Sequence, residues 1–99
     1  MSEELKKQQE IKIEIDDQTA NGAYSNSALI THSETEFILD FIFVQPQNAK
    51  AKVRSRIVLS PLHAKKLSEA LKENIAKHEM KFGQIKSQNS VGAKSEFYN

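Results

Sequence analysis

Residues 37–44 read Phe-Ile-Leu-Asp-Phe-Ile-Phe-Val, which is the strongest strand signal in the chain. In a strand, the odd-numbered Phe37, Leu39, Phe41 and Phe43 would share one face. The other face would carry Ile38, Ile42 and Val44, interrupted once by Asp40. A strand that is apolar on both faces is expected to be covered on both sides. One helix can cover one face, so we expect a second subunit to cover part of the other.

A partner strand is predicted at residues 50–59, after the turn Pro46-Gln47-Asn48. Apolar residues alternate there with four cations, Lys50, Lys52, Arg54 and Arg56. If the two strands form a hairpin, the phenylalanine face has to match the face of Ala51, Val53 and Ile57. Asp40 then joins the basic face near Arg54 or Arg56, where a cross-strand ion pair contributes about 0.2–1 kcal/mol. This pairing explains the acid without catalysis.

A long helix is predicted after this strand, with Ser60 as N-cap, Pro61 at the first helical position and Gly83 as C-cap. Its stripe repeats at steps of three or four residues: Ala64, Leu67, Leu71, Asn74, Ile75, His78 and Phe82. About 22 residues make a rod of roughly 33 Å, which exceeds the span of an eight- or nine-residue strand. The last turns should overhang the sheet, which makes His78 and Phe82 a candidate subunit contact.

Two further strands are predicted before this hairpin. Ile11, Ile13 and Ile15 alternate with charged residues, as in a two-faced strand. The turn residues Asn21-Gly22 then lead into a second strand at residues 23–31. The predicted fold is therefore α+β: a four-stranded antiparallel sheet followed by one long C-terminal amphipathic helix, packed on the Phe37/Leu39/Phe41/Phe43 face.

Composition predicts a single ββββα domain at residues 11–83, a flexible segment at 1–10 and a disordered tail at 84–99. The net charge of +1 argues against a polybasic arm or an acidic tail. The absence of cysteine excludes a disulfide framework and a cysteine-based zinc site. No apolar run approaches the length of a membrane span, and the N-terminal residues lack the apolar core that a secretory signal would have. We therefore expect a cytoplasmic protein that does not bind membranes.

Chemistry-bearing motifs are sparse. The three histidines, His32, His63 and His78, lack the spacing of metal ligands, and His32 with Glu34 and Glu36 forms the only compact cluster. Three glycines, at 22, 83 and 92, build no phosphate-binding loop, and no serine sits in a nucleophile elbow. We therefore expect no catalytic residue, no metal and no cofactor, and a protein that is not an enzyme.

The basic row Lys50, Lys52, Arg54 and Arg56 is the most functional-looking feature, and it spans about 20 Å of strand. Tyr24 could add a stacking surface for bases and Asn26 an amide for hydrogen bonding. These six residues form the candidate binding set, and nucleic-acid binding through the basic face of this strand is our alternative hypothesis. The competing interpretation, which we favour, is a solvated sheet face balanced by Asp40 and Glu14.

Five segments carry a family resemblance: TANGAYSN (19–26), ITHS (30–33), EFILDF (36–41), KAKVRSR (50–56) and LSPLHAKKL (59–67). Together they resemble a family of small bacterial proteins catalogued as a domain of unknown function. That resemblance implies no activity, cofactor or site residue. Four antiparallel strands before a long helix also resemble, at the level of fold, the SecB export chaperones, whose subunits pair through sheets and helices. This likeness favours an oligomer that binds polypeptide.

The leading hypothesis is a small non-enzymatic homo-oligomeric protein-interaction module, adaptor or chaperone-like, with itself and a protein as partners. It rests on the doubly apolar strand and on the overhanging helix stripe. The candidate oligomer interface comprises Ile38, Ile42, Val44, His78 and Phe82.

Overall fold

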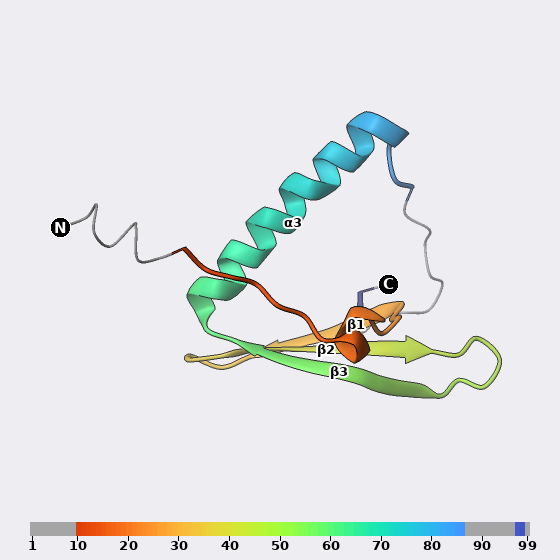
Figure 1. The fold of residues 1–99 in the computed structure, drawn as a ribbon. Coiled ribbons are helices and arrows are strands. Elements are labelled where there is room, and N and C mark those ends of the chain that lie inside the picture. The colour runs from red at the N-terminus through yellow and green to blue at the C-terminus, as the bar shows by residue number, and fades with distance from the viewer. Residues whose placement is uncertain (1–9, 87–96, 99) are drawn as a thin grey trace.

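The structure is a computed structural model that describes residues 10–86, 97 and 98 (Figure 1). It is α+β, with an antiparallel sheet built on three strands of six to nine residues, followed by a long helix, and a two-residue strand at one edge of the sheet. The elements are α2 (Asp17–Ala20), β1 (Ser27–His32), β2 (Phe37–Val44), β3 (Ala51–Leu59), α3 (Pro61–Phe82) and the two-residue β4 (Phe97–Tyr98), which pairs with β1. The predicted class, the β2–β3 hairpin and the helix boundaries are confirmed.

The strand β2 lies at the centre of the sheet, between β1 and β3. A tight turn joins β1 to β2, with the Ser33 N–H donating to the Glu36 carbonyl at 2.9 Å. Because β2 has a neighbour on each edge, it holds the most protected side chains. Leu39 and Ile42 are the buried apolar residues in the described part of the chain.

A β-bulge interrupts the pairing of β2 with β3. Phe41 pairs with Ser55 and Ile42 with Val53, so Arg54 is an extra residue on β3. A bulge shifts the alternation of side chains by one residue. Ile57 therefore shares the face of Leu39, as predicted, whereas Ala51 and Val53 pair with Val44 and Ile42 on the opposite face. The prediction that Ala51, Val53 and Ile57 share one face is wrong for the first two.

The helix α3 begins as the sequence predicts. The Ser60 hydroxyl accepts from the His63 N–H at 3.2 Å, and Gly83 ends the helix with φ 98°. The predicted packing against the sheet holds only near the start of the helix. Figure 1 shows α3 rising away from the sheet along its length, and no α3 residue is buried. Ser60 alone separates β3 from α3, so this single junction sets the direction in which the helix departs.

The N-terminal part differs most from prediction. Residues 11–15 run extended without joining the sheet, and β1 begins at Ser27 instead of residue 23. Between them, the Asp16 carboxylate accepts from the Thr19 N–H at 2.9 Å and caps the short α2, which was not predicted. The predicted turn is confirmed, with Gly22 at φ 77°. Alternating apolar and charged residues give a segment one apolar and one polar face. Joining a sheet also requires a neighbouring strand to pair with, which this pattern does not specify. Most of the predicted flexible ends lies outside the described residues.

Candidate functional site

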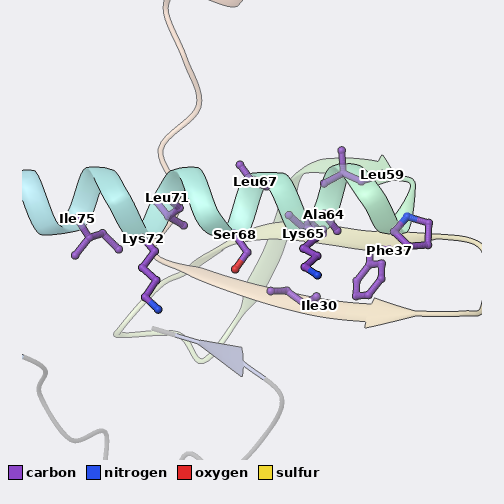
Figure 2. A pocket seen from close by; sticks show the side chains of 12 residues that line it. Ile30, Phe37, Leu59, Ala64, Lys65, Leu67, Ser68, Leu71, Lys72 and Ile75 are labelled. Atoms are coloured by element: carbon purple, nitrogen blue, oxygen red, sulfur yellow. The ribbon is translucent and has the colours of Figure 1, made fainter.

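An apolar cleft lies between α3 and the face of the sheet beneath it (Figure 2). Its volume is about 710 Å³. The sheet contributes Ile30, Phe37, Leu39 and Leu59. The helix contributes Pro61, Ala64, Leu67, Leu71 and Ile75, together with Lys65, Ser68 and Lys72. The cleft exists because the helix departs from the sheet at Ser60 instead of lying down on it.

The helix wall of this cleft is uncovered. Leu67 is 44% exposed, Leu71 56% and Ile75 41%. These are the residues of the predicted apolar stripe, and they face a sheet that is apolar in turn. The structure therefore brings two apolar surfaces opposite each other without closing them into a core.

The predicted basic row is split between the two faces of the sheet. Lys52 pairs with Phe43, on the face of the cleft, whereas Arg56 pairs with Asp40 on the opposite face. The bulge at Arg54 causes this split, since it shifts the alternation between Lys52 and Arg56. The prediction of four cations on one face is therefore wrong.

Asp40 and Arg56 form a bidentate ion pair. The Arg56 Nε donates to Asp40 Oδ1 at 2.7 Å and an Arg56 terminal nitrogen donates to Oδ2 at 2.9 Å. These hydrogen bonds lower the pKa of Asp40 despite its burial, and the same bonds raise the pKa of Arg56. The predicted pairing of Asp40 with a β3 arginine is confirmed. A buried carboxylate held by two charge-assisted bonds has a structural role.

The remaining cations gather around aromatic rings at the far end of β2 and β3. The Arg54 guanidinium carbon lies 5.9 Å from the Phe43 ring centre, and the Tyr24 ring meets the Phe43 ring edge-on at 6.1 Å. A hollow of about 530 Å³ beside Phe43 is also lined by Lys50 and Lys52. We refer to Tyr24, Phe43, Lys50, Lys52 and Arg54 as the cation–aromatic patch.

Phe43 was assigned to the core face from sequence, so its place in the patch was missed. A signal was present: Ser55 occupies an inward position where the alternation calls for an apolar residue. A polar residue at that point marks the disturbed pairing next to Arg54. On the two sides of this point, the cations of β3 lie on opposite faces of the sheet.

Asn26 does not join this patch through its amide. Its side chain accepts from the Val44 N–H at 2.9 Å and donates to the Val44 carbonyl at 3.1 Å. The amide thus continues the β1–β2 pairing by one step and has a structural role. Tyr24, in contrast, is 71% exposed.

The candidate interface residues are distributed unevenly. Ile42 is only 4% exposed, so a partner would gain little by covering it, whereas Ile38 and Val44 are half-buried. At the far end of α3, Phe82 is 67% exposed and its ring lies 4.9 Å from that of His78. The exposed apolar residues Val53 and Val58 join Ile38 and Val44 on the face opposite the cleft.

The other two histidines have local roles. His32 stacks on Phe37, with ring centres 5.4 Å apart, and His63 lies beside Ser60 in the first turn of α3. Within residues 10–86, 97 and 98, no three acidic, histidine or cysteine side chains come together as a metal site would require. In that same part of the chain, no helix combines the length and hydropathy needed to cross a bilayer.

The sequence of this chain matches a known protein family. A family model described as "Protein of unknown function (DUF3467)" covers residues 1–87. The chain belongs to this family. The family resemblance of the five sequence segments is thereby confirmed, and it extends from the sheet through the whole of α3. No curated protein and no solved structure matches the chain, and the likeness to SecB is not confirmed.

Proposed function

We propose that the protein is a non-enzymatic homo-oligomeric protein-interaction module in which a second copy covers the apolar cleft. The single observation that carries this proposal is the exposed stripe of α3 opposite the apolar sheet face. Its proposed setting is the bacterial cytoplasm, because the sequence contains no cysteine and its five segments resemble a family of small bacterial proteins.

The energetics of the helix support an oligomer. Most of the stability of a protein helix comes from packing its apolar face, because helix formation in water is marginal. In α3 that face makes little contact with its own sheet. Covering the exposed halves of Leu67, Leu71 and Ile75 would contribute about 1 kcal/mol for each side chain. A two-fold dimer gains this contribution twice, since each copy presents the same cleft.

Sedimentation velocity from about 1 to 200 μM tests the proposal. We expect a concentration-dependent rise from the mass of one chain, 11.2 kDa, to that of two or more. A single species of one chain's mass across this range would contradict it. Affinity capture with the assembled protein as bait then identifies the protein partner of the module.

Single-stranded nucleic acid is the second candidate ligand, and the cation–aromatic patch favours it. Three cations there line the hollow beside Phe43, and Tyr24 presents an exposed ring. Bases stack on exposed aromatic rings while cations contact phosphates, without need of a sequence code. The patch differs from the predicted basic row in two ways. Arg56 is absent from it because it pairs with Asp40, and the ring of Phe43 lies beside its cations.

Fluorescence anisotropy with labelled single-stranded and duplex DNA and RNA at about 50 and 200 mM salt tests this candidate. Binding should weaken steeply with salt, since counterions are released from each contacted phosphate. The Lys52→Ala/Arg54→Ala variant should lose binding. Lys66→Ala removes a cation that lies outside the patch, on α3, and serves as the control. Equal affinities of both variants, or no binding at low salt, would contradict the hypothesis.

A further inference from the structure

Residues 11–15 are built like a strand but have no neighbour. Ile11, Ile13 and Ile15 are 80%, 89% and 64% exposed, although they alternate with Lys12 and Glu14 as in a sheet. The segment runs as an open, uncoiled stretch of chain (Figure 1), and it pairs with none of the described strands. Its free N–H and C=O groups and its row of isoleucines are what an added strand offers.

The sheet has an unpaired edge to which such a segment could add as a strand. In the strand order β3-β2-β1-β4, β3 lies at one edge, and no described strand pairs with its outer side. Ile57 is 42% exposed there, on the cleft face. An open strand edge with exposed apolar side chains is a template for pairing with another chain.

We propose that residues 11–15 of one copy add to the outer edge of β3 in a second copy, antiparallel, with Ile13 opposite Ile57. The inference rests on the homo-oligomer proposed above and specifies how its copies join. The exchange is reciprocal, because each chain carries one free segment and one free edge. Two copies therefore close into a dimer, as in other exchanges of an identical element between protomers.

The side chains fix the register and the direction. With Ile13 opposite Ile57, antiparallel pairing places Ile11 opposite Leu59, so both isoleucines extend the apolar floor of the cleft. On the other face, the same register places Glu14 opposite Arg56, whose side chain remains 63% exposed while it binds Asp40. Opposite charges across a strand pair are favourable, and like charges are unfavourable.

Parallel pairing at the same point would place Lys12 opposite Arg56 instead. Two cations would then face each other beside a carboxylate that is already occupied on both oxygens by Arg56. The antiparallel register is thus the one in which both faces of the added strand find suitable neighbours.

Cysteine cross-linking tests this register directly, because the natural chain has no cysteine. Directly opposed residues of an antiparallel pair have Cα atoms about 4.5–5.5 Å apart, which a disulfide bridges. Ile13→Cys protein and ¹⁵N-labelled Ile57→Cys protein are mixed, oxidised by dissolved oxygen and resolved by mass. The control mixture replaces Ile57→Cys by Met80→Cys, since Met80 is 88% exposed on α3.

We expect the mixed Ile13→Cys/Ile57→Cys dimer to form at least tenfold faster than the control dimer. Equal rates, in a protein that light scattering shows to be oligomeric, would overturn strand exchange and leave the proposed homo-oligomer standing. A protein that stays monomeric at every concentration would overturn both. In the Ile13→Cys/Ile57→Cys double variant, a disulfide that closes within one chain at low concentration would overturn exchange between copies.

Two matched pairs of variants provide a second readout. Lys12→Pro removes a backbone N–H that faces β3 in this register and should weaken the dimer at least tenfold, whereas Glu10→Pro lies outside the segment and should not. Glu14→Lys places a cation opposite Arg56 and should weaken the dimer more than Lys12→Glu. Equal dissociation constants within either pair, with unchanged circular dichroism, would contradict the assigned register.

Discussion

Shortening Leu71 to alanine should weaken the proposed dimer about thirtyfold. Leu71 lies on the helix wall of the cleft with 56% of its surface exposed. Burying a whole leucine side chain contributes about 1.5–3 kcal/mol, so covering the exposed half contributes about 1 kcal/mol. A symmetric dimer loses this contribution twice, about 2 kcal/mol, and each 1.4 kcal/mol changes the dissociation constant tenfold.

Sedimentation equilibrium at several loading concentrations measures this change. Alanine has the highest helix propensity, so Leu71→Ala does not weaken α3 itself, and circular dichroism at matched concentration checks the helix content. Met80→Ala is the control, because Met80 is an exposed apolar residue of the same helix that does not line the cleft.

The comparison of these two variants decides between a specific contact and general surface hydrophobicity. If Leu71→Ala and Met80→Ala change the dissociation constant equally, the cleft is not the surface that a second copy covers. If Leu71→Ala leaves the dissociation constant at the natural value, the proposed burial of the helix stripe is refuted, whatever the oligomeric state of the protein.

Further predictions concern stability. Asp40→Asn should lower the urea midpoint at pH 7 by removing the charged partner of Arg56; an unchanged midpoint would contradict a stabilising pair. Because the fold lowers the pKa of Asp40, its contribution is present above the ordinary aspartate value of about 3.9 and is lost as pH falls through the lower folded value. Acid titrations of the natural protein and Asp40→Asn should therefore converge at low pH. Ser60→Ala should cost about 1 kcal/mol by removing the N-cap of α3, measured by urea unfolding. Gly22→Ala should lower the melting temperature despite open space around the site, because φ 77° is strained for alanine.

The part of the fold that could be predicted from sequence is the part specified by local signals. The alternation of residues 37–44 fixes β2, and the caps Ser60 and Gly83 fix both ends of α3. The direction of α3 could not be predicted, because it depends on backbone angles at Ser60 and not on the pattern of its apolar stripe. The prediction of a strand at 11–15 was wrong for a related reason. Whether a segment pairs depends on which strand lies next to it in the folded protein, and the local sequence does not determine that.

The candidate site was predictable only in its composition. The cations and Tyr24 are candidate binding residues from sequence, but their grouping depends on the bulge at Arg54, which exchanges the faces of β3 halfway along. Arg56 resembles the neighbouring cations in sequence, but its guanidinium is held in an ion pair with the buried Asp40. Asn26 likewise looked like a ligand-binding amide and serves the backbone of Val44.

The bulge also separates the two surfaces for which functions are proposed. The cleft lies where Phe37 pairs with Leu59, and the cation–aromatic patch lies where Phe43 pairs with Lys52. Phe43 lies six residue steps along β2 from Phe37, a distance of about 20 Å. Substitutions that far apart, without shared partners, are expected to act independently. Leu71→Ala should therefore weaken association without changing the anisotropy titration, and Lys52→Ala/Arg54→Ala should do the reverse. A variant that moved both measurements together would show that assembly builds the nucleic-acid surface, with the patch completed only in the dimer.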